Sequence, residues 1–214
     1  MRYYGQHGED TLIEKYFDEN HKGVCIDVGA AQPMYGNNTY LFETRGWDAY
    51  CIEANPSQIA NLVSTRKKVY HYAVGSEDSE SMDFSIVTLS GGNQEAISSL
   101  KIDEQLLKDH EGYSPKIEIV KVPVRTLNTI VEELGIKDID FISIDTEGTE
   151  LDVLKGFDIE KHQPKLFVIE NNYNTSEVED YLKEFGYIKD QRLAVNDFFI
   201  KNNRYEILNG WKAR

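Results

Sequence analysis

Cysteine is almost missing from this 214-residue chain, which has only two, Cys25 and Cys51. Two cysteines cannot form the multi-bridge framework of a small secreted domain or the four-thiolate set of a structural zinc site. Each lies inside a short apolar run of the kind that forms a buried strand, so we expect small apolar core residues rather than ligands. This usage is consistent with a reducing compartment.

Long hydrophobic runs and basic charge are also scarce. No apolar stretch approaches the roughly 20 residues of a transmembrane helix, and the N-terminus has no signal-peptide core. We therefore expect a cytoplasmic protein without a membrane span. Lysine and arginine number 23 against 37 acidic residues, a net charge of −14. This balance disfavours nucleic acid or an anionic membrane surface as a partner.

The glycine pattern of a dinucleotide site is incomplete. Residues 24–28 form an apolar run typical of a buried parallel strand, and Gly29, Ala30 and Ala31 follow it. The G-x-G-x-x-G turn uses its second glycine to admit a pyrophosphate, but Ala31 stands at that position, with no basic residue nearby. A nicotinamide-dependent dehydrogenase is therefore disfavoured.

A second expected strand, at 49–52, ends in Glu53. An acid at this strand tip, roughly 20 residues past the glycine turn, is placed to accept hydrogen bonds from the two hydroxyls of a ribose. Small residues at the end of the first strand also let a ligand approach the backbone closely. A cofactor without phosphates that carries adenosine and an amino-acid tail fits this pattern, and S-adenosylmethionine is the candidate.

Strands and helices alternate from Val24 to Phe185, which predicts an α/β fold with helices on both faces of a mostly parallel sheet. The last two strands follow a short connection and predict an antiparallel hairpin at one edge. The expected architecture is a Rossmann-like, doubly wound, seven-stranded sheet in a single domain over residues 1–214, with 88–116 as an insertion or lid. We expect strands near 24–28, 49–52, 69–74, 82–87, 117–122 (ended by Pro123), 140–145, 165–169, 187–190 and 197–201.

Three expected strands end in an acid, namely Glu53, Asp145 and Glu170. Parallel strands share a carboxyl edge, so these tips should meet, and gathered carboxylates repel one another unless a cation lies between them. Two hypotheses follow. A divalent ion such as Mg²⁺ would be held through oxygens by Asp145, Glu170 and Asn171. Alternatively, one carboxylate would be a general base whose pKa is raised by its neighbours.

Several segments in order carry a family resemblance. The most specific is I-D-T-E-G-T-E-L at 144–151 with L-K-G at 154–156. The others are Q-H-G-E-D at 6–10, I-D-V-G-A at 26–30, N-N-T at 37–39, G-W at 46–47, I-E-A-N-P at 52–56, A-V at 73–74 and P-V-R-T-L at 123–127. Together they resemble the FkbM family of S-adenosylmethionine-dependent methyltransferases. Many members carry a lysine where this chain has Ser143, so no role of that lysine transfers.

The resemblance implies O-methylation of a small-molecule or glycan acceptor, mostly sugars and natural products. It places the cofactor across the glycine turn and Glu53, with adenine near 72–74. The cofactor-binding residues that we predict on this basis are Gln6, Asp27, Gly29, Ala30, Asn38, Thr39, Glu53, Ala54, Asn55, Tyr72, Ala73, Val74 and Asp145.

A sugar hydroxyl is a poor nucleophile at neutral pH, so a base is useful. The candidates, in order, are Glu147, Asp145 and His7. Glu147 and Glu150 also stand at a predicted helix start, where acids offset the helix dipole, and His7 could equally be a surface residue. The open alternatives are an inactive nucleoside-binding or scaffold protein of the same fold, and methyl transfer to an amine or a carboxylate.

Overall fold

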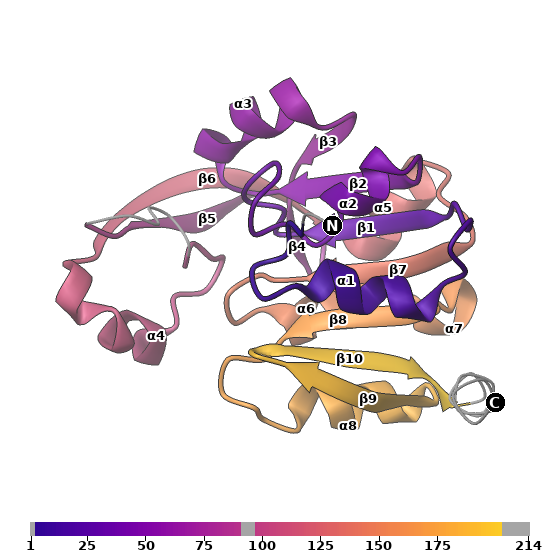
Figure 1. Cartoon of the computed structure of the whole chain (residues 1–214). Helices are drawn as coiled ribbons and strands as arrows, with labels where there is room; N and C mark the ends of the chain where they lie inside the picture. The colour runs from indigo at the N-terminus through magenta and orange to yellow at the C-terminus, as the bar shows by residue number, and fades with distance from the viewer. Residues whose placement is uncertain (1–2, 91–96, 203–214) are drawn as a thin grey trace.

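The computed structural model describes residues 3–90 and 97–202, and its centre is a seven-stranded sheet of order β3-β2-β1-β7-β8-β10-β9 (Figure 1). Parallel pairing joins β1, β2, β3, β7 and β8, whereas β10 runs antiparallel to both β8 and β9. This confirms the predicted Rossmann-like α/β sheet with an antiparallel edge hairpin. Its strands are β1 (Val24–Val28), β2 (Asp48–Glu53), β3 (Lys68–His71), β7 (Ile139–Ile144), β8 (Leu166–Glu170), β9 (Tyr187–Leu193) and β10 (Asn196–Lys201).

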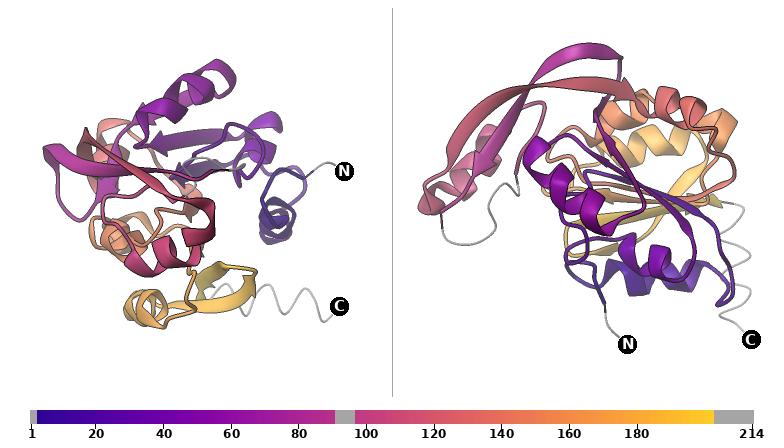
Figure 2. Two further views of the ribbon diagram at one scale, coloured as in Figure 1. Left: turned by 90° about the vertical axis from the view of Figure 1, so that its left-hand side faces the viewer. Right: turned by 90° about the horizontal axis from the view of Figure 1, so that it is seen from above.

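Both faces of the sheet are covered because successive side chains of a strand point to opposite sides. In β1, Cys25 belongs to a core cluster on one face and Ile26 to a cluster on the other. The helices on the Cys25 side are α1 (Glu9–Ile13), η1 (Glu14–Tyr16), α2 (Tyr40–Thr44) and α3 (Pro56–Thr65). Those on the Ile26 side are α5 (Leu127–Glu133), α6 (Glu150–Lys155), α7 (Ile159–His162) and α8 (Glu177–Glu184) (Figure 2).

The strand expected at 69–74 is wrong in extent, because the chain changes sheets within it. β3 ends at His71, and β4 (Ala73–Gly75) joins a separate three-stranded sheet of order β4-β6-β5. In this sheet, β5 (Ser79–Thr88) and β6 (Lys116–Thr126) form a long antiparallel ribbon that extends away from the main sheet (Figure 2).

β6 also continues through Pro123, where we expected the strand to end. The pairing of β5 with β6 shifts register between Ser79 and Met82, opposite this proline. A bulge tolerates a residue without an N–H group, so β6 continues through Pro123 instead of ending there.

After the ribbon's first strand, the chain forms α4 (Glu104–Asp109) and η2 (Glu111–Tyr113) before it enters β6. Asp103 caps α4, with its Oδ1 accepting from the backbone N–H groups of Gln105 and Leu106 (2.8 and 3.0 Å). The single domain and the role of 88–116 as an insertion or lid stay predictions, and 91–96 lie outside the described residues. Within 3–90 and 97–202, no helix is long and apolar enough to span a bilayer.

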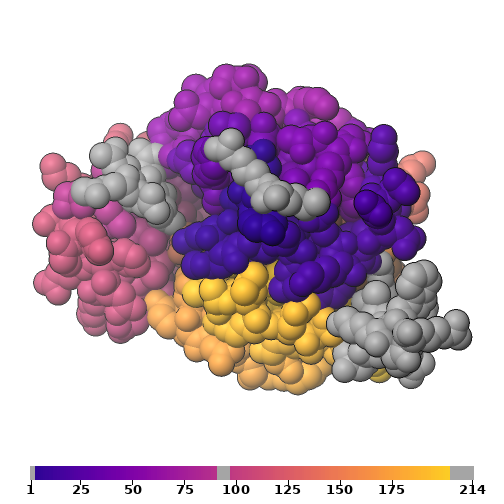
Figure 3. All heavy atoms as spheres, viewed as in Figure 1, coloured from indigo at the N-terminus to yellow at the C-terminus, as the bar shows by residue number. Residues whose placement is uncertain are grey.

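The first helix and the last strand lie against each other on one face of the molecule (Figure 3). Asn196 Nδ2, at the start of β10, donates to Glu9 Oε1 in α1 (2.9 Å), and both side chains are buried. The N-terminal motif is therefore fastened beside the carboxyl end of β8, whose Glu170 pairs with Asn196 in the sheet.

Candidate cofactor and active site

A pocket opens at the carboxyl ends of β1, β2 and β7, where the main sheet meets β4 and β5. It measures about 650 Å³ when the solvent space at its open mouth is included. The predicted catalytic residues Asp145 and Glu147 both line it, whereas His7 does not. The predicted cofactor residues in the lining are Gly29, Glu53, Ala54, Asn55, Tyr72, Ala73, Val74 and Asp145.

Gly29 forms the turn at the end of β1, and only glycine fits there. Its φ is +81°, and an added Cβ would lie 1.7 Å from the carbonyl oxygen of Asp145. The backbone N–H groups of Gly29 and Ala30 donate to the carbonyl of Ile52 in β2 (3.0 and 3.2 Å). The turn therefore brings the ends of β1, β2 and β7 together at the pocket.

Glu53 ends β2, and its side chain is held rigidly at the pocket wall. Oε2 accepts from the backbone N–H of Ala31 (2.8 Å), and Oε1 accepts from that of Asn55 (2.6 Å). Burial raises the pKa of Glu53, and these N–H groups oppose the rise. Each carboxylate oxygen has a further lone pair, so Glu53 can still accept from the two hydroxyls of a ribose.

The next wall of the pocket is apolar. The wall contains Tyr72, which precedes β4, and Ala73 and Val74 of β4. Phe84 of β5 and Leu100 complete the wall. Ala73 and Phe84 share one small core cluster. A flat heteroaromatic ring is the kind of ligand group that such a wall accepts.

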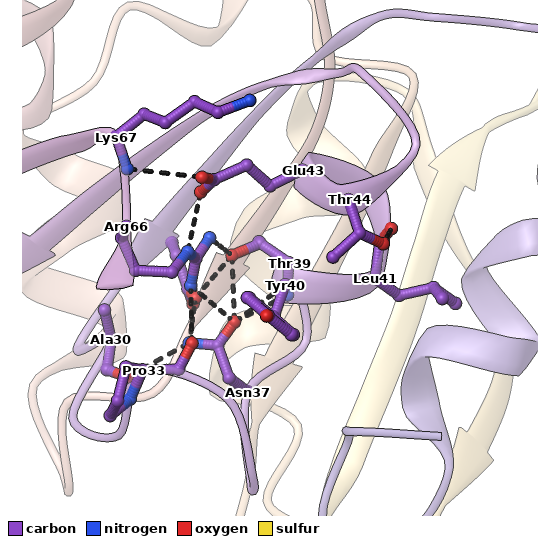
Figure 4. A network of polar contacts seen from close by, with 11 residues as sticks. Ala30, Pro33, Asn37, Thr39, Tyr40, Leu41, Glu43, Thr44, Arg66 and Lys67 are labelled. Carbon is purple, nitrogen blue, oxygen red and sulfur yellow. Dashed lines mark hydrogen bonds and ion pairs between the residues drawn. The ribbon is translucent and has the colours of Figure 1, made fainter. Parts of the chain in front are cut away.

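Asp27 lies outside the pocket lining, in a buried polar network whose other members, Thr39 and Arg66 among them, are drawn in Figure 4. Its Oδ2 accepts from Asn37 Nδ2 (2.7 Å) and Thr39 Oγ1 (2.8 Å). The guanidinium of Arg66 donates to Asn37 Oδ1 (2.9 Å), Thr39 Oγ1 (2.8 Å) and Glu43 Oε2 (2.6 Å). Burial raises the pKa of Asp27, and the Arg66 charge opposes that rise. All five side chains are buried.

Three acidic side chains meet beside the pocket. Asp145 and Glu147 follow β7, Glu170 ends β8, and one carboxylate oxygen from each lies within 4.8 Å of the others. Glu170 is 8 % exposed, and its Oε2 accepts no hydrogen bond from the described residues while the neighbouring acids are ionised. A proton shared with Asp145 contributes to the raised pKa of Glu170. Glu147 also has a left-handed backbone, with φ +56°, a conformation that a non-glycine residue rarely adopts without support.

These carboxyl groups strongly disfavour simultaneous ionisation. Burial raises the pKa of Asp145 to about 7, and the charge of Glu150 adds to the rise. Burial and the charge of Asp145 raise the pKa of Glu147 to about 9. Burial and the same neighbours raise the pKa of Glu170 well above its usual range. A cation placed among them would offset both the cost of burying their negative charges and the repulsion between those charges.

The side chains of two nearby polar residues, Asn171 and Glu150, are hydrogen-bonded to groups outside this cluster. The amide of Asn171 donates to the Thr175 carbonyl (2.9 Å) and to Asp197 Oδ2 (2.8 Å), and its oxygen accepts from the Thr175 N–H (3.0 Å). Oε1 of Glu150 accepts from the backbone N–H of Thr146 and of Gly148 (both 3.0 Å), which holds the loop after β7.

A family model described as the methyltransferase FkbM domain matches residues 27–189 of the chain. The chain belongs to the FkbM methyltransferase family. The matched range contains the glycine turn, Glu53 and all three acids of the cluster. No curated protein matches the chain.

The N-terminal motif of this FkbM chain lies outside the matched range. Gln6 and His7 are exposed, whereas Glu9 and Asp10 are fully buried. Glu9 Oε2 accepts from the backbone N–H of His7 (2.8 Å), and Asp10 Oδ2 from that of Tyr4 (2.8 Å). The motif thus fixes its own loop and leaves the side chains of Gln6 and His7 on the surface.

The other predicted cofactor residues also lie outside the lining. Ala30 packs with Cys51 and Leu62 in a small core cluster. Thr39 belongs to the buried network, and Asn38 Nδ2 donates to Ser143 Oγ (3.1 Å). These residues are not among those that line the pocket, and their part in cofactor binding stays a prediction.

Sequence reasoning did not find several residues of the buried network and of the pocket lining. Arg66 stands before two lysines and resembles part of an exposed basic group, although it lies one helical turn after the buried Leu62, a spacing that could have signalled an inward direction. The additional lining residues come from loops, the ribbon and helix α3, and apart from Ala31 of the glycine turn no local pattern marks them. They include Ala31, Gln58, Phe84, Ser98, Leu100, Thr146 and Thr149.

Proposed function

We propose that this FkbM protein transfers a methyl group from S-adenosylmethionine to a hydroxyl of a sugar, glycan or natural product. The observation that carries the proposal is Glu53, a buried carboxylate at the pocket wall that two backbone N–H groups hold in place. Ribose would bind to Glu53 and adenine against the Tyr72–Val74 wall. The methionine end would lie toward Asp145, whose charge suits a sulfonium.

The reaction is a displacement in line with the breaking bond. The acceptor oxygen forms a bond to the methyl carbon while the carbon–sulfur bond breaks, and S-adenosylhomocysteine leaves. The hydroxyl proton passes to a carboxylate, and Asp145 or Glu147 would take it because both line the pocket. His7 is exposed and outside the lining, which makes it a weaker candidate.

As the alternative to a carboxylate base, we propose that Asp145, Glu147 and Glu170 hold a divalent cation such as Mg²⁺. Three carboxylate oxygens within 4.8 Å of one another are a donor set for a hard cation. The buried, unpartnered Oε2 of Glu170 favours a ligand there, and Glu147 replaces Asn171, whose amide is used elsewhere. A bound cation would lower the pKa of an acceptor hydroxyl and orient it.

Calorimetry with S-adenosylmethionine, S-adenosylhomocysteine and NAD in parallel tests the cofactor. We expect binding of the first two only, and binding of NAD alone would overturn the proposal. A panel of hydroxyl, amine and carboxyl acceptors, assayed by release of S-adenosylhomocysteine, then tests the reaction. Cofactor binding without turnover on any acceptor would favour the inactive nucleoside-binding alternative.

Titration of the purified, metal-free protein with Mn²⁺, followed by electron paramagnetic resonance, tests the cation site without any acceptor. We expect one bound ion in the wild type and in Glu133→Gln, a control at an exposed acid of α5, and loss of that ion in Glu170→Gln. Equal Mn²⁺ binding in all three proteins, or full activity in excess chelator, would exclude a catalytic ion at this cluster.

A further inference from the structure

Arg66 is a completely buried guanidinium beside, but not in, the pocket. Its side chain is 0 % exposed and pairs with Glu43 through Nε (2.6 Å). The two terminal nitrogens reach the other acceptors, Asn37 Oδ1 (2.9 Å) and Thr39 Oγ1 (2.8 Å). Three acceptors in three directions match the planar fork of arginine, and a lysine ammonium could not satisfy them together.

Thr39 connects this guanidinium to Asp27. Its hydroxyl donates to Asp27 Oδ2 (2.8 Å) and accepts from Arg66 (2.8 Å), which uses its single proton and a lone pair. Arg66 is thus the cation that two buried carboxylates, Asp27 and Glu43, share in this network. Burial of such a network is tolerated only when every member is paired, so loss of one bond weakens the others.

The network determines where the loop of residues 30–39 runs. Asn37 Nδ2 donates to the carbonyl of Ala30 (3.1 Å), and Arg66 reaches the carbonyl of Pro33 (3.5 Å), so both halves of the loop are attached (Figure 4). Ala31 follows Ala30 in the chain, lines the pocket and donates its N–H to Glu53. One continuous set of hydrogen bonds therefore runs from Arg66 to the proposed ribose-binding carboxylate.

We propose that Arg66 is a positioning residue for the methyl donor. It holds the 30–39 loop so that the Ala31 N–H keeps Glu53 in the orientation that accepts the ribose hydroxyls. This inference rests on the proposed function, and it would give Asp27 and Thr39, which lie outside the pocket lining, an indirect part in cofactor binding. Arg66 would therefore affect the affinity for the methyl donor and not the chemical step at the acid cluster.

The test compares Arg66→Lys with Arg45→Lys, the same change at the C-cap of α2, where the side chain is 36 % exposed and paired with Glu14. The dissociation constant for S-adenosylhomocysteine is measured by calorimetry, and the melting temperature is measured without ligand. We expect Arg66→Lys to bind roughly 10-fold or more weakly, the loss expected for one charge-assisted hydrogen bond. Arg45→Lys should bind as the wild type does.

Thr39 provides a second pair of variants should Arg66→Lys not fold. Thr39→Val removes the hydroxyl and should weaken binding, and Thr39→Ser keeps it and should restore wild-type affinity. A purely structural role would lower the melting temperature while the folded protein kept its dissociation constant. Wild-type affinity in folded Arg66→Lys or in Thr39→Val would overturn the inference, whereas a wild type that does not bind would overturn the proposed function itself.

Discussion

Replacing Glu53 by glutamine tests the cofactor assignment with almost no change in volume. In the wild type, both carboxylate oxygens accept backbone N–H groups, from Ala31 (2.8 Å) and Asn55 (2.6 Å). Glutamine offers one oxygen and one NH₂ group, so its NH₂ must face one of these N–H donors. The variant therefore loses the negative charge, one internal hydrogen bond and at least one acceptor for ribose.

The expected loss of affinity follows from the charged hydrogen bonds at risk. A hydrogen bond to a charged partner contributes roughly 1.5–3 kcal/mol, so losing one or two to the ribose costs roughly 1.5–6 kcal/mol. At about 1.4 kcal/mol per tenfold, the dissociation constant should rise by about 10-fold to 10⁴-fold. The loss of stability should be smaller. One buried N–H left unpaired costs roughly 1–3 kcal/mol, and removing a buried carboxylate whose pKa is raised offsets part of this.

The assay is a calorimetric titration of wild type, Glu53→Gln and the surface control Glu133→Gln with S-adenosylmethionine, accompanied by thermal melting of each protein without ligand. A folded Glu53→Gln protein that binds as tightly as the control would refute the ribose assignment. Weak binding together with a collapsed melting curve would show a structural defect instead, and Glu53→Asp, which keeps the charge, would then separate the two effects.

Three further predictions follow from the same region. Asp145→Asn and Glu147→Gln should each lower turnover at least roughly 100-fold without unfolding the chain; near-wild-type rates in both would place the chemistry elsewhere. Gly29→Ala should cost at least roughly 3 kcal/mol in urea unfolding, because its Cβ would meet the Asp145 carbonyl, while Gly135→Ala, at φ +62° in open space, should cost less. Folding raises the pKa of Asp145 to about 7 and of Glu147 to about 9, so the folded chain binds more protons than the unfolded chain. The melting temperature of cation-free protein should therefore fall as the pH rises from about 5 to about 9. A constant or rising melting temperature over this range would contradict this prediction.

The sheet was predictable because its strands carry their own signals. Short apolar runs ended by Gly29 or by an acid such as Glu53 are local features, and each places its end on the shared carboxyl edge once the strands pair in parallel. The site on that edge was accordingly predicted as a group of strand-end residues. The exchange of sheets after His71 was not predicted, because 69–74 is a mostly apolar run without glycine or proline. Only the pairing of Ala73–Gly75 with β6 (Lys116–Thr126) divides it.

What the sequence by itself determined is the order of elements, the glycine turn and the presence of acids at three strand ends, since each depends on neighbouring residues and on backbone geometry alone. Only the tertiary structure decided what each polar side chain touches. Asn171 bonds to Asp197, which is 26 positions away, and Asp27 reaches the Arg66 charge through Thr39. A buried polar group takes the partner that packing brings within about 3 Å, and no spacing along the chain specifies that partner.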